Sequence, residues 1–151
     1  MASIQSSEKF TFENNVKLYD HDPGATTAVE SPTTRLDMMD YNEFIAQAMV
    51  TIVAAGGMTK LEIVAAAAAS GGTAYVIKDS GTIAADAIGD VATQSCTAEE
   101  IAQIGTDNGV ELRYVAARLT STTATDECTV TIVRCEPRYA SAGLTPATDL
   151  A

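Results

Sequence analysis

The sequence predicts an all-β fold: a β-sandwich of jelly-roll-like type with one short α-helix and an N-terminal arm. Segments with period-two alternation recur along the chain, a strong helix signal is confined to one segment, and loops rich in Gly, Thr, Ser and Asp separate the alternating segments. The 151 residues, 46% of them hydrophobic, suit one globular domain. Because aromatic residues make up only 5%, small aliphatic side chains must fill the core.

Residues 1–34 form the predicted arm. Lys9–Phe12 and Val16–Tyr19 can each make a short alternating strand, whereas Asp20–Thr34 has the composition of a loop. Such a long loop is uncommon inside a compact domain unless it is functional or extends outward. We therefore expect the arm to add a strand to a neighbouring subunit. The alternative is an edge strand of its own domain. The candidate contact residues are Phe10, Phe12, Val16 and Leu18.

The β-sandwich domain is expected over residues 35–151. Phe44–Val53 has one wholly apolar face and one mixed face, as in a strand packed on a core. The turn at Ala55–Met58 leads to a return strand at Lys60–Ala65. Further strands are predicted at Thr73–Lys78, Val110–Leu119 and Cys128–Cys135. Residues 82–92 are weakly patterned, and residues 136–151 are predicted to be an exposed tail.

The single predicted helix begins at a capping box. The Thr97 hydroxyl can accept a hydrogen bond from the backbone NH of Glu100, and the Glu100 carboxylate can accept one from the Thr97 NH. Ile101–Ile104 continues the helix, and Gly105 is expected to end it. The pattern predicts a helix of two turns over residues 97–104.

The net charge of −11 excludes some classes of partner. A nucleic-acid surface needs clustered Lys and Arg, and the nine basic residues here are scattered. No apolar segment approaches the roughly 20 residues of a membrane span, and the N-terminus lacks the pattern of a signal peptide. We therefore expect a soluble protein that contacts neither nucleic acid nor membrane.

Three cysteines are expected to be reduced and mostly buried. Cys128 and Cys135 are seven residues apart on one predicted strand, so they should face opposite sides and cannot pair without breaking it. Cys96 could meet one of them. We expect three free thiols, made in a reducing cytoplasm, and no disulfide requirement for folding.

No catalytic, metal or cofactor site is predicted, and the chain is not expected to be an enzyme. His21 is the only histidine, and it lies in a loop-like segment between Asp20 and Asp22, where solvated side chains are more common than a metal site. Capping accounts for Glu99 and Glu100. No Gly-rich phosphate loop joins a strand to a helix.

Arg113 and Arg134 are the candidate partner-binding residues of the domain. Each lies on one of the last two long predicted strands. A guanidinium there can pair with a carboxylate across a subunit boundary. The alternative is an ordinary exposed salt bridge within the chain.

Three segments resemble small virion proteins of tailed bacteriophages. The segments are Leu36-Asp37-Met38-Met39-Asp40-Tyr41, the Leu-Arg-Tyr-Val-Ala-Ala-Arg sequence within Gly109–Arg118, and the Thr-Val-Thr-Ile-Val-Arg strand at Thr129–Arg134. The resemblance covers roughly residues 35–144. It implies a β-sandwich scaffold and assembly into a virion, and it brings no catalytic residues.

The function that the resemblance implies is that of a capsid decoration (cement) protein. The expected partners are the major capsid protein and further copies of the chain, as a trimer. The expected location is the capsid surface of a virion, after synthesis in the bacterial host cytoplasm. A head-to-tail connector or tail component is the first alternative. A host- or carbohydrate-binding module is the second, although the absence of Trp argues against it.

Overall fold

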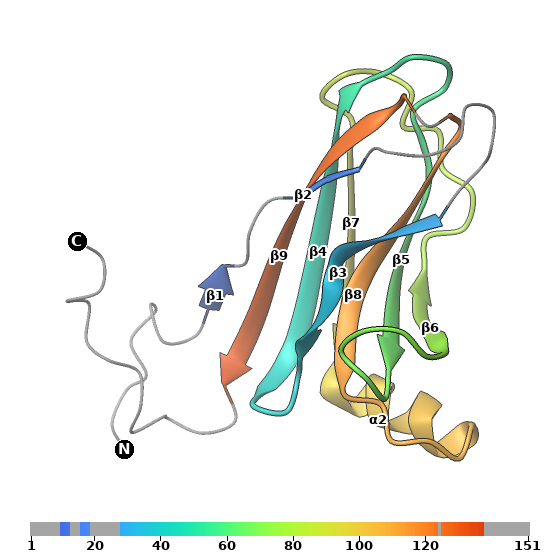
Figure 1. Cartoon of the computed structure of the whole chain (residues 1–151). Helices are drawn as coiled ribbons and strands as arrows, with labels where there is room; N and C mark the ends of the chain where they lie inside the picture. The colour runs from blue at the N-terminus through green and yellow to red at the C-terminus, as the bar shows by residue number, and fades with distance from the viewer. Residues whose placement is uncertain (1–9, 13–15, 19–27, 124, 138–151) are drawn as a thin grey trace.

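The computed structural model describes residues 10–12, 16–18, 28–123 and 125–137. Two antiparallel sheets pack face to face, which confirms the predicted all-β sandwich (Figure 1). Sheet A contains β1 (Phe10–Phe12), β2 (Val16–Leu18), β9 (Glu127–Pro137), β4 (Tyr41–Ile52) and β7 (Val91–Thr97). Sheet B contains β3 (Ala28–Asp37), β8 (Tyr114–Ser121), β5 (Met58–Ala66) and β6 (Ala74–Asp79).

The strand order is that of a jelly roll. Sheet A runs from β1 and β2 through β9 and β4 to β7, and sheet B runs from β3 through β8 and β5 to β6. The antiparallel pairs are nested in the sequence: β2 with β9, β3 with β8, β4 with β7, and β5 with β6. One long hairpin, rolled up so that successive pairs fall in alternate sheets, produces this order.

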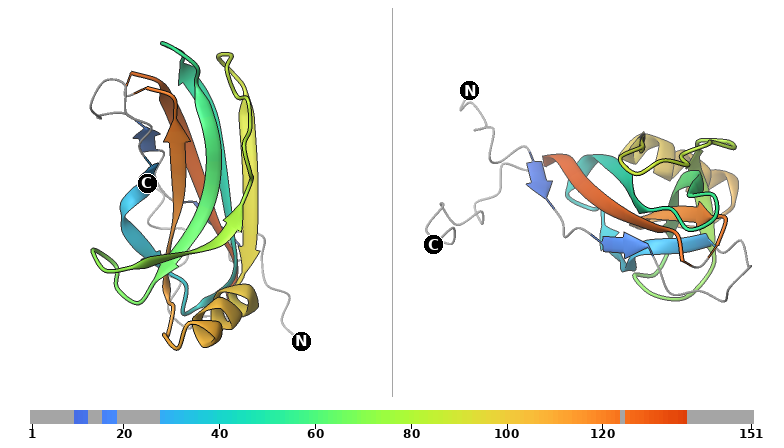
Figure 2. Two further views of the ribbon diagram at one scale, coloured as in Figure 1. Left: turned by 90° about the vertical axis from the view of Figure 1, so that its right-hand side faces the viewer. Right: turned by 90° about the horizontal axis from the view of Figure 1, so that it is seen from above.

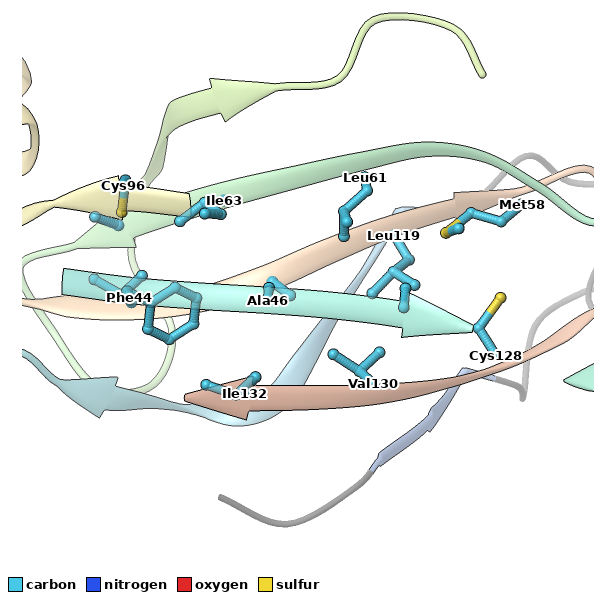
Figure 3. Close-up of a cluster of buried hydrophobic side chains, with 14 of the residues drawn as sticks. Phe44, Ala46, Met58, Leu61, Ile63, Cys96, Leu119, Cys128, Val130 and Ile132 are labelled. Atoms are coloured by element: carbon cyan, nitrogen blue, oxygen red, sulfur yellow. The ribbon is translucent and has the colours of Figure 1, made fainter. Parts of the chain in front are cut away.

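The core lies between the two sheets and contains small and medium-sized side chains. Every second residue of β4 points inward, and Phe44, the largest of the fully buried side chains, begins this row. Leu61 and Ile63 of β5, in sheet B, face this row of β4 side chains across the core (Figure 3). Other buried core residues drawn there are Ala46, Met58, Cys96, Leu119, Cys128, Val130 and Ile132.

Strand β3 corrects the predicted domain boundary. The loop was expected to reach Thr34, but β3 begins at Ala28 and pairs with β8. The register shifts between Ser31 and Leu36, and Pro32 falls in that irregular stretch. A proline is tolerated at a sheet edge or an irregularity because no ladder hydrogen bond is needed from it there. Residues 28–34 therefore belong to the sandwich.

Strand β7 was not predicted. Its residues Val91–Thr97 pair with β4 from Met49 to Glu43. Its side chains are small or polar on both faces, so the hydrophobic alternation that identifies a half-buried strand is weak. In contrast, Val110–Arg113 was predicted to be strand, and β8 begins only at Tyr114.

Helix α2 (Ala98–Asp107) closes one end of the sandwich (Figures 1 and 2). The predicted capping box is present at Thr97 and Glu100. The helix does not end at Gly105. A Cβ at that position would lie 2.6 Å from the carbonyl oxygen of Val110, so glycine allows the returning chain to pass close to the helix. The turn that follows uses Gly109, whose φ is +66°.

Candidate partner-binding surfaces

The two arginines identified in the sequence lie together at the end of β3. Nε of Arg113 donates a 2.8 Å hydrogen bond to Oδ1 of Asp37, and Nη2 of Arg113 donates to Oδ2. Nη1 of Arg134 donates to the carbonyl oxygen of Asp37 at 2.9 Å. The Arg134 guanidinium also lies 4.4 Å from the centroid of the Tyr41 ring, within the range of a cation–π contact.

The Arg113–Asp37 contact is a salt bridge within the chain, which was the alternative to an intersubunit contact for Arg113. Hydrogen bonding from Arg113 is the largest cause that lowers the pKa of Asp37, so this carboxylate stays ionised. The Arg113 side chain remains 39% exposed, and it can still present one edge to a partner. A contact of either arginine with another subunit remains a prediction.

A groove of about 750 Å³ opens beside this cluster, between α2 and the Met38–Met39 turn. Met39 is 57% exposed, whereas Met38 and Ile101 are buried at the groove floor. Thr106, Glu111 and Arg113 supply its polar lining. The remaining lining residues are small or apolar: Ala98, Ala102, Gly105, Gly109, Val110 and Leu112. The groove suits an apolar side chain of a partner better than a polar metabolite.

The four candidate residues of the arm lie on β1 and β2. Both strands pair antiparallel with β9 of the same chain, along one edge of sheet A. The Cα partners of Phe10, Phe12, Val16 and Leu18 are Cys135, Val133, Val130 and Cys128, respectively. This backbone path corresponds to an edge strand of the chain's own domain. Contact of these residues with a neighbouring subunit remains a prediction.

The described part of the chain shows no cluster of three or more His, Cys, Asp and Glu side chains that could hold a metal ion. His21 lies outside the described residues. The Glu100 carboxylate accepts the Thr97 NH at 2.9 Å and forms an ion pair with Lys78, so its position is explained by capping and pairing.

The cysteines are buried and carry free thiols. Burial raises the pKa of Cys96 to about 12 and that of Cys128 to about 11. Since the thiolate is the reactive form, both are poor nucleophiles near neutral pH. Cys128 belongs to the core cluster and Cys135 does not, in keeping with their opposite faces on β9.

The central part of the outer face of sheet A carries no charged side chain across the adjacent strands β9, β4 and β7, and Glu43 of β4 and Glu127 of β9 lie beyond it. Residues 45–49 of β4, 91–97 of β7 and 129–133 of β9 contain no Asp, Glu, Lys, Arg or His. Met49 and Val91 are cross-strand neighbours there and are 41% and 52% exposed. Sequence reasoning missed this surface because β7 was not identified as a strand.

The outer face of sheet B is charged, but its charges are paired. Arg118 donates to Glu62 at 2.7 Å, and Lys60 lies 3.0 Å from Glu62 and 2.8 Å from Asp79. Burial alone would raise the pKa of Glu62, but hydrogen bonds from Arg118 and Lys60 outweigh it and lower the pKa. This network links the adjacent strands β8, β5 and β6.

In the described residues, no helix combines the length and apolar character needed to cross a bilayer.

Comparisons with known proteins give little information on this chain. No protein-family model and no curated protein matches it. A solved structure described as belonging to Bacillus endospore appendages, "a novel family of disulfide-linked pili", has a TM-score of 0.33 and 10% sequence identity. That similarity covers 89% of this chain and 96% of the other chain. At this TM-score it establishes neither a shared fold nor a shared function.

Proposed function

We propose that this chain is a non-enzymatic structural subunit of a tailed-phage virion, which binds the assembled capsid lattice as a decoration protein. The observation that carries the proposal is the charge-free surface of sheet A, which residues 45–49, 91–97 and 129–133 form on a chain whose net charge is −11. The described charged side chains on the strands of sheet B form ion pairs, and the buried Asp126 carboxylate accepts backbone NH hydrogen bonds. The charge-free surface is therefore the part of the molecule best suited to protein contact.

The resemblance to phage virion proteins supplies the identity of the partner. Its segments lie in β3 and the turn before β4, in the segment from Gly109 into β8, and in β9. The proposed partners are the major capsid protein and further copies of this chain. The proposed location is the virion surface, after synthesis in the host cytoplasm.

A lattice offers many identical sites at fixed spacing. Free subunits with a charge of −11 repel one another, which limits the self-association of free subunits before assembly. Weak contacts become effective when a shell holds neighbouring subunits close together, because the second contact is then intramolecular. Binding to assembled shells is therefore favoured over binding to free capsid protein.

Co-sedimentation of the purified chain with empty capsids tests the proposal. We expect saturable binding to assembled shells, with many copies spread over the lattice, and no binding to unassembled capsid protein. A copy number that fits a single ring at one vertex would contradict decoration and favour a connector. No binding to any shell would contradict both.

The N-terminal arm requires a separate test. We propose that the part of the expected arm that precedes β3, residues 1–27, contributes to capsid binding through Phe10, Phe12, Val16 and Leu18. Deletion of residues 2–20 should leave a folded sandwich, measured by circular dichroism and thermal unfolding, that no longer binds shells. If the truncated chain unfolds or aggregates, β1 and β2 are part of its own fold and the intermolecular role is wrong.

A further inference from the structure

Three described sheet edges differ in how they are protected against strand addition. The edge at β3 is interrupted by a register shift around Pro32 and carries the Arg35–Glu30 ion pair. The edge at β6 ends in Lys78 and Asp79, both of which form ion pairs. Charged side chains, prolines and irregularities are the features by which natural sheets prevent edge-to-edge pairing. Strand β7 has none of them.

The backbone of β7 is accessible on one side. The strand pairs with β4 along one edge, and on the other edge the described residues provide no backbone hydrogen bond to residues 91–96. Val91, Thr93 and Ser95 are exposed on the outer face. A hollow of about 490 Å³ lies beside the strand, between Gln94 and the loop that begins at Ser80. Figure 2 shows β7 at the side of the sandwich, above α2.

We propose that β7 pairs antiparallel with β7 of a second copy of this chain, about a two-fold axis at Gln94. Sheet A would then continue across two subunits. A two-fold contact requires a strand that complements itself, because residue i meets residue j and residue j meets residue i. Strand addition of this kind is a common mode of recognition.

The sequence of β7 meets this requirement. Pairing about Gln94 places Thr93 opposite Ser95 of the second copy, a pair of hydroxyl side chains that stabilises antiparallel sheets. It places Ala92 opposite Cys96 and Val91 opposite Thr97, so that each pair is matched in size. The strand is thus nearly symmetric about its centre in side-chain size, and its polar pair, Thr93 and Ser95, lies next to the axis.

Charge also favours a second copy as the occupant. Two chains of charge −11 repel each other least where neither presents a carboxylate, and Val91–Thr97 contains no charged residue. Asp90 and Glu99 flank the strand, and the two-fold axis brings each near the other end of the partner. Added salt screens this repulsion, so self-association should strengthen as ionic strength rises. The contact forms a dimer and not the trimer expected from the sequence, and it does not depend on capsid binding.

Sedimentation of the purified full-length chain at several concentrations and ionic strengths tests the pairing. The wild-type chain should show a monomer–dimer equilibrium that shifts toward dimer with added salt. The double substitution Thr93→Glu/Ser95→Glu sets like charges opposite each other twice and should weaken the dimer by about tenfold or more. Thr93→Lys/Ser95→Glu sets opposite charges face to face and should restore the dimer.

A matched control adds the same two charges elsewhere. Ser70→Glu/Thr73→Glu changes one serine and one threonine in the exposed loop between β5 and β6, and the dimer should persist. A wild-type chain that is monomeric under all conditions would overturn the proposal. So would a dimer that Thr93→Glu/Ser95→Glu leaves intact, or one that the charge-swapped variant fails to restore. Capsid co-sedimentation of the same variants reports separately on the proposed function.

Discussion

The outer faces of the two sheets use charge in opposite ways. On sheet B, Arg118, Glu62 and Lys60 form a continuous network across neighbouring strands. On sheet A, the described parts of β4, β7 and β9 present hydroxyl, amide and aliphatic side chains without a charge between residues 45–49, 91–97 and 129–133. Both faces belong to one sandwich and are built on similar strands. The sandwich fold itself therefore does not require this difference.

In this protein, charged side chains stabilise the fold where they are paired, and they are absent from the surface for which a protein contact is proposed. On sheet B, the ion pairs of the edge strand β6 oppose pairing with another chain. The ion pair between Glu62 and Arg118 holds the neighbouring strands β5 and β8 in register. A face without charges loses little hydration when another protein covers it. Loss of a buried or paired carboxylate should therefore destabilise the fold, whereas charge added to the outer face of sheet A should not.

Replacement of Asp126 by alanine should have the largest effect on stability. This fully buried carboxylate accepts the backbone NH groups of Ala54 at 2.7 Å, Ala55 at 3.1 Å and Thr123 at 3.0 Å. Asp126→Ala leaves these donors without partners, and the free energy of unfolding should fall by about 3 kcal/mol. Chemical denaturation measures the loss. Asp126→Asn, which keeps one acceptor oxygen, should lose less; an equal loss in both variants would contradict this account.

The same carboxylate should make stability depend on acid pH. Burial alone would raise the pKa of Asp126, but the hydrogen bonds from Ala54, Ala55 and Thr123 outweigh it, so the pKa lies below its ordinary value. The stabilisation is therefore present above the unfolded-state pKa of about 3.9 and is lost as pH falls through the lower folded-state pKa. Denaturation at a series of pH values measures this. The decline below about pH 4 should be shallower for Asp126→Asn than for the wild type.

Replacement of Glu62 by alanine should have a smaller effect. The side chain is 6% exposed and lies between Arg118 and Lys60, so its removal leaves Arg118, 24% exposed, without its carboxylate. We expect a loss of about 1–2 kcal/mol in the free energy of unfolding, because the two cations can still reach solvent. The double variant Glu62→Ala/Arg118→Ala should recover part of this loss. A greater loss in the double variant than in the two single variants combined would argue against pairing.

The smallest effect is expected on sheet A. Thr93→Glu/Ser95→Glu changes two exposed side chains that make few contacts within the subunit, and the free energy of unfolding of the monomer should change by no more than about 0.5 kcal/mol. Thermal unfolding in dilute solution measures this. A large loss would mean that these positions support the fold itself, and the contrast between the two faces would then fail.

Part of this structure follows from local sequence patterns. Alternation at Phe44–Val53 identified the central strand of sheet A, and the Thr97–Glu100 capping box identified the start of α2. Both signals are local because the residues that interact are within one strand face or one helical turn. The pairing of Arg113 with Asp37 joins residues 76 positions apart, and no spacing in the sequence predicts that contact.

Other features escaped prediction for definable physical reasons. Strand β7 lacks large apolar side chains because it lies at an edge, and β3 contains a proline that usually indicates a loop. The role of Gly105 depends on the approach of Val110, which only the folded chain brings near. Asp126 binds backbone amides 72 residues away, and backbone amides leave no signal in side-chain identity.

Hydrogen–deuterium exchange tests most directly the contrast between the uncharged edge strand β7 of sheet A and the charged edge strand β6 of sheet B. The exchange of both strands is measured in dilute protein, in concentrated protein at raised ionic strength, and on capsids. We predict slower exchange in Val91–Thr97 in at least one of the two associated states, with unchanged exchange in Ala74–Asp79. Slowing in β6 equal to that in β7, or no slowing of β7 in either associated state, would contradict the account.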